Sequence, residues 1–411
     1  MSVTSPQRWL AALPHPSGPL QEVQRRGRIR FGNLPVPSRR LEAWRLTNLS
    51  RLEALLDLAT VPVPLPVLSS WPEPPAKSIQ IVLNPFSDPL ANIQLPAGVY
   101  PLTQAELSRT LGRGLERCAC LFDWPVVLND SAASSLLALR ISGRLTTPLE
   151  VIVPSFPVCL AATRLLLLLD DEAELDLLQV LVGDSGSAHS HLVEIRLGHN
   201  ARLNHGWLAL GGGDAALLGH LALEQKPYSY YGLTSVHSGW SFGRFEPRIV
   251  QVGGRANTCI RGLQVTMGNQ QLATHALMRF DGPQGTLDQL QKGLAGGRSH
   301  NIFNGTVQVP RLAQLTDAAQ LSRNLLLSSY ARIDTKPELE IVADDVRCTH
   351  GATIGQLQQE ELFYLQSRGI AVNQASALLI SGYCSEVLSM LPADAASRWR
   401  PMDALMQEVS A

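Results

Sequence analysis

The chain has 411 residues, of which 45% are hydrophobic and 17% are charged, and its 34 Lys and Arg are balanced by 35 Asp and Glu. This composition is typical of a globular protein with two or three domains, or with one long repetitive domain and caps. A net charge of −1 excludes the basic field that nucleic acid or an anionic membrane would require, so we predict neither as a partner.

Six cysteines are scattered over the chain, at positions 118, 120, 159, 259, 348 and 384. This spacing is unlike a disulfide framework and favours a reducing compartment. The first ten residues show no cationic segment followed by an apolar core, so we expect no secretory signal. The longest apolar run, 165–169, is far shorter than the about 20 residues of a membrane-spanning helix. We therefore expect a cytoplasmic protein.

Residues 1–58 predict helices, because their Trp and Leu side chains recur at helical spacing. The stretch near 61–75 is rich in proline, which fits neither a helix interior nor a central strand, and it predicts a linker. A strand is predicted at 79–83 and a helix at 103–118. We therefore assign residues 1–130 to a mostly helical N-terminal region.

Residues 131–350 predict a core that is mainly β. Short runs of alternating residues, such as Arg202–Leu210, recur between Gly, Asn, Asp and Ser turns. Between 145 and 345, only Pro310–Leu327 has a pattern that could hold a sizeable helix. Strands spaced by about ten residues are typical of a sandwich, a barrel or a stacked β-solenoid, and the pattern alone leaves these three architectures open.

Residues 351–411 predict a C-terminal helical domain. One helix is expected at 357–368, and Gly369 is suited to end it. Asn373 is suited to cap a second helix, which ends before Pro392, and a last amphipathic helix follows.

Several motifs can be set aside. The chain has no G-x-x-x-x-G-K-[ST] loop, so we predict no ATPase activity of its own. Cys118 and Cys120 form a single C-x-C pair, which is too small for a four-ligand zinc or iron–sulfur site. His189 and His191 lie in a stretch that reads as a Gly/Ser loop, where exposed histidines are commoner than metal ligands.

Cys348 and His350 are the candidate site. Residues at positions i and i+2 of a strand share one face, so the two side chains are predicted to point the same way. A thiolate is a soft iron ligand and an imidazole is a borderline one, but a cluster usually takes four ligands. A cluster here would therefore be labile or shared across a subunit interface. The structural alternative, which the residues alone favour, is that Cys348 is a small buried hydrophobe and His350 hydrogen-bonds the turn.

A resemblance to a known family bears on this choice. The run 340–353, EIVADDVRCTHGAT, followed by 362–370, LFYLQSRGI, resembles the SufB/SufD family of iron–sulfur cluster assembly proteins. The Cys-x-His-Gly-Ala-Thr form resembles its SufD branch. The resemblance extends to PSRRLEAWRLT at 37–47 and QLTDAAQLSRNLLL at 314–327. It implies a right-handed parallel β-helix core flanked by N-terminal and C-terminal helical segments.

The resemblance also implies a function. It implies a non-enzymatic scaffold subunit that pairs with a SufB-type scaffold through the β-helix region and binds a SufC-type ATPase through its C-terminal helices. His350 and Cys348 would belong to a cluster or iron site shared with the SufB-type partner. The residues expected to dock the ATPase are Leu362, Phe363, Tyr364 and Arg368. No cofactor is expected to be permanently bound, only a transient iron–sulfur cluster or iron.

Other interpretations stay open. The chain could be a SufB-like scaffold that builds the cluster itself, although its moderate length and few cysteines count against this. It could be a β-helix enzyme acting on polysaccharide, although its carboxylates are scattered. A self-sufficient iron–sulfur protein is a third possibility. The sequence does not decide whether the chain forms a homodimer when alone or whether a flavin associates with the complex.

Overall fold

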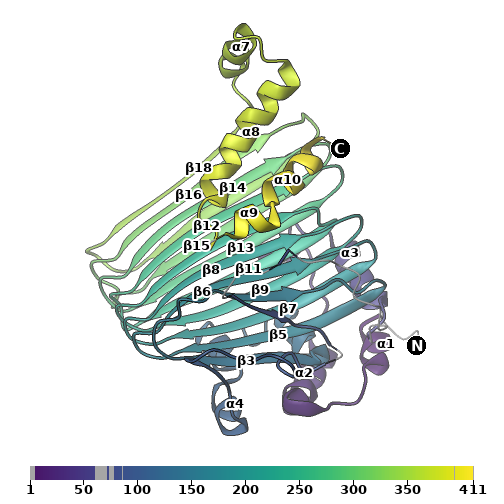
Figure 1. Ribbon diagram of the computed structural model, residues 1–411, viewed down its shortest axis with the longest axis vertical. Coiled ribbons are helices and arrows are strands. Elements are labelled where there is room, and N and C mark those ends of the chain that lie inside the picture. The colour runs from purple at the N-terminus through teal and green to yellow at the C-terminus, as the bar shows by residue number, and fades with distance from the viewer. Residues whose placement is uncertain (1–4, 61–71, 74–77, 86, 393, 411) are drawn as a thin grey trace.

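The chain folds into a parallel β-solenoid with helices at both ends (Figure 1). This computed structural model describes residues 5–60, 72–73, 78–85, 87–392 and 394–410. Each turn of chain adds one strand to each of two sheets, so the strands from β3 to β18 make about eight turns. The predicted parallel β-helix core with flanking helical segments is confirmed. The proline-rich linker predicted near 61–75 lies outside the described residues, apart from Pro72 and Glu73.

The two sheets take alternate strands of the chain, and every pair of neighbours is parallel except β2 with β3. In spatial order, sheet A contains β17 (Arg332–Ile341), β15 (His300–Val309), β13 (Gln271–Asp281), β11 (Phe242–Val252), β9 (Ala216–Gln225), β7 (Ser187–Leu197), β5 (Cys159–Leu169), β3 (Ser135–Ile141) and β2 (Val99–Pro101). Sheet B contains β1 (Ile79–Val82), β4 (Leu149–Val153), β6 (Glu174–Val182), β8 (Arg202–Leu210), β10 (Tyr230–Ser238), β12 (Asn257–Thr266), β14 (Thr286–Ala295), β16 (Asp317–Leu326) and β18 (Arg347–Gly355).

The lumen between the sheets is filled mainly by apolar side chains such as Val151, which belong to one large buried cluster. It also buries polar side chains in several turns. Gln179 lies 2.8 Å from His191, Gln291 donates to Gln264 at 3.0 Å, and Gln320 donates to Gln289 at 2.9 Å. Contacts of this kind link neighbouring turns and add polar specificity to the packing.

The segment Pro310–Leu327, whose pattern could hold a sizeable helix, instead contains the strand β16. Ala318, Gln320, Ser322 and Asn324 are buried, and they alternate with residues that are mostly exposed. The period of two was hidden in the sequence because the inward side chains are small or polar rather than apolar.

Helices cover both sheets from outside. The N-terminal ones are α1 (Ser5–Ala12), α2 (Gln21–Asn33), α3 (Leu49–Ala54), α4 (Gln104–Thr110), α5 (Arg113–Arg117) and α6 (Trp124–Ala132), with 3₁₀ turns η1 (Gly18–Leu20), η2 (Glu42–Trp44) and η3 (Leu55–Asp57). The C-terminal ones are α7 (Gln359–Ser367), α8 (Val372–Leu388), α9 (Ala395–Trp399) and α10 (Pro401–Ser410).

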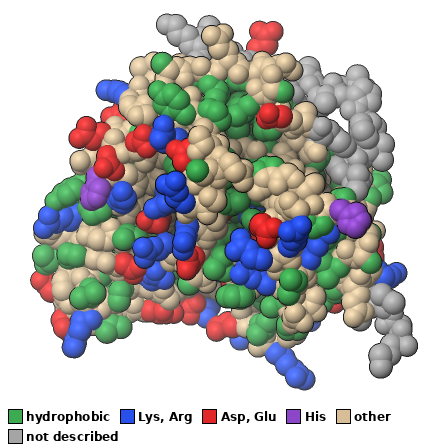
Figure 2. Space-filling model, turned by 90° about the horizontal axis from the view of Figure 1, so that it is seen from below, with side chains coloured by type: hydrophobic (Ala, Val, Ile, Leu, Met, Phe, Trp, Pro, Cys, Tyr) green, Lys and Arg blue, Asp and Glu red, His purple; other side chains and the backbone are tan. Residues whose placement is uncertain are grey.

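The outer helices leave distinct faces. α8 and α10 pack on the outer face of sheet B, whereas α7 stands away from the solenoid at the top of Figure 1. Seen from the opposite end, Lys and Arg side chains gather near the middle of the face (Figure 2). None of the helices that the structure describes combines the length and the apolar character that crossing a membrane requires.

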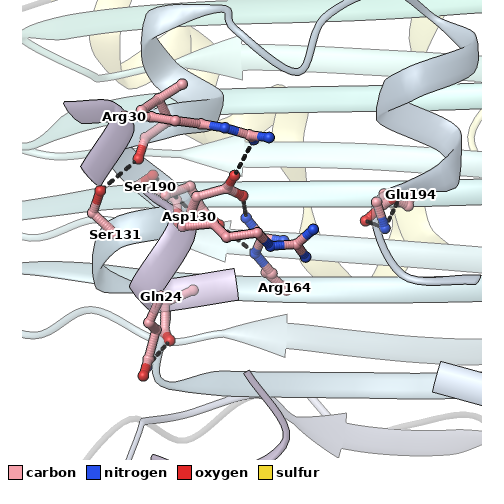
Figure 3. A network of polar contacts seen from close by, with 12 residues as sticks. Gln24, Arg30, Asp130, Ser131, Arg164, Ser190 and Glu194 are labelled. Carbon is pink, nitrogen blue, oxygen red and sulfur yellow. Dashed lines mark hydrogen bonds and ion pairs between the residues drawn. The ribbon is translucent and has the colours of Figure 1, made fainter. Parts of the chain in front are cut away.

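A buried polar network fixes α2 and α6 to sheet A (Figure 3). Arg164 of β5 donates to Asn129 at 2.7 Å and pairs with the carboxylate of Asp130, and both partners lie on α6. Arg30 of α2 lies 3.7 Å from the same carboxylate. A Cβ on Gly27 would lie 2.5 Å from the backbone of Asp130, so α2 can approach α6 this closely only with glycine at that position.

Glu194 of β7 anchors the short helix α5. Its two carboxylate oxygens accept the N–H of Gly112, at 2.9 and 3.0 Å, where the chain enters the helix (Figure 3). Burial raises the pKa of Glu194 to about 7, against the opposing charge of Arg164. The anchor therefore changes protonation state near neutral pH.

We expect Glu194→Gln to alter how stability depends on pH. The folded pKa of about 7 lies above the ordinary 4.5, so the stabilisation from this group is full below pH 4.5 and is lost as the pH rises through 7. The glutamine keeps an oxygen for Gly112 and does not titrate. The free energy of unfolding of the variant relative to wild type should therefore rise by about 3 kcal/mol between about pH 5 and about pH 8.

Urea unfolding at each pH measures this difference. Glu116→Gln, which removes an exposed carboxylate from the same helix, is the control and should show no such trend. If the free energy of unfolding of Glu194→Gln and of wild type changed with pH in the same way, this would contradict the pKa of about 7 for Glu194.

Candidate functional site

The last turn of the solenoid has strand neighbours on one side only. β17 pairs with β15, β18 pairs with β16, and both lie at the end of their sheet's order. Arg347 of β18 donates its N–H to the carbonyl oxygen of Thr316 at 2.8 Å. Alternate residues of a parallel strand bond to the same neighbouring strand. The N–H groups of Cys348, His350 and Ala352 therefore point away from β16, toward the opposite edge of β18. No strand among the described residues pairs with that edge.

The two ends of the solenoid differ in the length of their edge strands. At the N-terminal end the edges are β1 and β2, with 4 and 3 residues. At the C-terminal end they are β17 and β18, with 10 and 9 residues. Proteins usually keep free edges short, because a long one is a template for another strand. The longer open edge therefore lies at the C-terminal end of the described solenoid.

Cys348 and His350 lie on the side of β18 that faces the lumen. The register sets them opposite Ala318 and Gln320 of β16, which are both buried. Cys348 is half-buried against the core, whereas His350 is exposed. Burial raises the pKa of the Cys348 thiol, which favours its protonated form.

The described residues directly behind this pair offer no soft ligand. The lumen positions on β16 carry a methyl group, Ala318, and an amide, Gln320, whose Nε2 donates to Gln289 and whose buried Oε1 accepts no hydrogen bond. Neither type is a soft ligand for iron. An iron–sulfur cluster at the open mouth of the lumen would therefore need ligands from outside the turn.

The residues predicted to dock a partner lie on α7, which buries none of its side chains. Phe363 and Tyr364 are 72% and 58% exposed, and the Arg368 guanidinium lies 5.4 Å from the centre of the Tyr364 ring. Leu362 instead lines a hollow of about 480 Å³ between α7, α8 and the turns of the solenoid. Neighbouring exposed aromatic rings on a projecting helix make α7 a candidate interaction surface.

The expectation that His189 and His191 are loop residues is wrong. Both are buried within β7. His191 is within hydrogen-bond distance of Thr163 and Gln179, at 2.8 Å each, and burial lowers its pKa to about 3. The ring is therefore neutral and its nitrogens are occupied. Glycines and serines before the pair suggested a loop, but the hydrophobic alternation that follows continues the strand.

Cys118 and Cys120 pack as small hydrophobes. Both are buried, and the Cys118 thiol lies 3.6 Å from the Leu223 carbonyl oxygen and 3.4 Å from that of Arg248. Burial raises the pKa of Cys118 to about 12. All six cysteines of the chain are free thiols.

Sequence reasoning missed a buried charged cluster on sheet A. Asp123, His220 and Glu246 bring three potential metal-ligand atoms within 4.8 Å of one another. Nη2 of Arg248 lies 3.3 Å from Asp123 and 3.5 Å from Glu246, and Arg244 also pairs with Glu246. The two guanidinium groups balance both carboxylates, so the charge of the cluster is compensated without a metal ion, and we interpret it as an ion-pair network. Its one sequence signal is the alternation R-x-E-x-R at 244–248.

Comparison with known proteins places these features in a family. Residues 157–383 match the family model described as "SUF system FeS cluster assembly, SufBD core domain". The chain is 31% identical over 395 residues to the iron-sulfur cluster assembly SufBD family protein slr0076 of Synechocystis sp., covering 88% of this chain and 85% of that protein.

Two further relatives are similar over different lengths. Protein ABCI7, chloroplastic, of Arabidopsis thaliana is 28% identical over 405 residues, covering 93% of this chain and 85% of that protein. The iron-sulfur cluster assembly protein SufD of Escherichia coli (strain K12) is 35% identical over 142 residues, covering 34% of each chain.

The ion-pair interpretation of the Asp123–His220–Glu246 cluster predicts the effect of Arg248→Met. Removing one partner of a buried charge network leaves a carboxylate uncompensated, so urea unfolding should show a loss of about 3 kcal/mol. Arg144→Met breaks the exposed pair with Glu174 and should cost less than about 1 kcal/mol. Zn²⁺ or EDTA should leave the unfolding midpoint of wild type unchanged. A midpoint that rises with Zn²⁺ would instead indicate a metal site.

Proposed function

The chain belongs to the SufBD family of iron–sulfur cluster assembly proteins, and we propose that it is a SufD-type scaffold subunit without catalytic activity. In this proposal it pairs with a SufB-type scaffold and binds a SufC-type ATPase. It also contributes part of a site for a nascent iron–sulfur cluster or its iron. The observation that carries the proposal is the Cys348–His350 pair on the last turn, whose described strands have neighbours on one side only.

The long edges of β17 and β18 support pairing with the SufB-type scaffold. A strand added along β18 would bond to the outward N–H and C=O groups of Cys348, His350 and Ala352. Its own side chains would then lie next to the pair. The same edge could serve a second copy of this chain when the SufB-type partner is missing.

The ligand count supports a shared and transient site. Iron binding to Cys348 requires loss of the thiol proton, which burial opposes. Two ligands from this side hold a cluster only while the partner supplies the others. The cluster or iron is thus cargo that dissociates when the two subunits move apart, and we assign the chain no resident cofactor.

The exposed surface of α7 supports docking of the ATPase. Phe363 and Tyr364 project from a helix that has no buried residue, so a partner could cover both rings without unfolding the chain. The free cysteines support work in a reducing compartment, for which we propose the cytoplasm.

His350→Ala tests the shared site. Co-purified with the SufB-type and SufC-type subunits, the variant should assemble like wild type, because His350 is exposed and packs nothing. Its iron and acid-labile sulfide per complex should fall severalfold, because one ligand is lost. His199→Ala, which removes an exposed histidine after β7, is the control.

Unchanged iron and sulfide in His350→Ala would make the Cys348–His350 pair structural. Failure of the wild-type chain to form any complex would refute the scaffold assignment itself.

Phe363→Ala/Tyr364→Ala tests ATPase docking. The double variant should keep the SufB-type subunit and lose most of the SufC-type subunit on a sizing column, because buried aromatic anchors dominate interface energies. Phe122→Ala/Tyr228→Ala removes a Phe and a Tyr of similar exposure elsewhere and should retain both subunits. Equal SufC-type content in the two double variants would exclude α7 as the docking element.

A further inference from the structure

An arginine-lined hollow lies on the outer face of sheet A, apart from the last turn. Its volume is about 640 Å³. Seven of the eight lining residues are charged and five of them are arginine; they are Arg109, Arg113, Glu116, Arg117, Ala119, Arg196, Glu224 and Arg279. The chain as a whole has a net charge of −1, so this accumulation of positive charge is local.

The floor of the hollow is set by strand register. Arg196 of β7 pairs with Glu224 of β9, Glu224 pairs with Val250 of β11, and Val250 pairs with Arg279 of β13. Neighbours in register point to the same face of a sheet. Two guanidinium groups and one carboxylate are thus held on a rigid surface.

The wall of the hollow is α5 with the end of α4, and it is fixed at two points. Glu194 accepts the N–H of Gly112 before the helix. Arg279 donates to the carbonyl oxygen of Arg117, the last residue of the helix, at 2.9 Å. These two contacts hold α5 against sheet A, so the arginines of the wall are carried by an anchored helix and not by an unattached loop.

Carboxylates compensate this positive charge only in part. Glu224, whose side chain is 7% exposed, is shared between Arg117 at 4.0 Å and Arg196 at 3.6 Å. Glu116 pairs with Arg113 at 2.8 Å. Outside the lining, Asp281 accepts from Nε and Nη2 of Arg279 at 2.9 Å each. Glu106, which pairs with Arg140 at 3.2 Å, also interacts with Arg109. The five guanidinium groups of the lining still outnumber these four carboxylates, and the surplus favours an anion in the hollow.

We propose that this hollow binds a small multivalent oxyanion, a phosphate or polycarboxylate compound. Arginine forks match the paired oxygens of both groups. Among the described lining residues only Ala119 is uncharged, so neither an aromatic ring nor a large apolar side chain lines the hollow. Recognition therefore rests on the charge and the hydrogen-bond donors of the guanidinium groups. This proposal is independent of the iron–sulfur function.

Calorimetric titration of the full chain with pyrophosphate and, separately, with citrate tests the proposal. Wild type should bind at least one of the two at a single site. Arg109→Gln/Arg113→Gln should weaken that binding about tenfold or more, because two charge-assisted contacts are lost. Binding of pyrophosphate alone assigns phosphate chemistry, and binding of citrate alone assigns a polycarboxylate.

Arg144→Gln/Arg311→Gln removes the same charge from exposed positions outside the hollow and should bind as wild type does. Arg109→Gln alone, at an exposed position, should weaken binding if the double variant fails to fold. No binding of either anion to wild type, or equal weakening in the control variant, would overturn the proposal.

Discussion

Backbone hydrogen bonding ties each inner turn of this solenoid to the turn before it and the turn after it. In the part of the chain that the structure describes, the first and last turns have strand neighbours on one side only. The edge strands at the N-terminal end have 4 and 3 residues, and those at the C-terminal end have 10 and 9. A long edge is a template for another strand, so the C-terminal edge offers the larger surface for strand addition.

The lumen combines apolar packing with buried polar contacts along its length. Gln179 lies within hydrogen-bond distance of His191 in the early turns, and Gln320 donates to Gln289 near the open end, where Cys348 and His350 lie at the mouth. A cluster usually takes four ligands, so two side chains from this chain would not complete a cluster site by themselves.

Sequence patterns predicted part of this arrangement. The alternation of Cys348 and His350 placed both on one face, but strand spacing left sandwich, barrel and solenoid equally open, and only the family resemblance chose among them. The strand β16 was missed because its inward residues are small or polar, and the buried position of His191 was missed because the residues before it are polar. A search for alternating hydrophobic residues does not detect such positions. The Asp123–His220–Glu246 cluster joins residues from separate elements, so no local pattern could predict it.

Amide hydrogen exchange along β18 tests the central claim most directly, in the dilute monomer and in the complex with the SufB-type partner. The N–H of Arg347 bonds to β16 and should be protected in both states. The account predicts that the N–H groups of Cys348, His350 and Ala352 exchange rapidly in the monomer and become protected in the complex. Equally rapid exchange of these three groups in the complex would show that the partner does not pair with this edge.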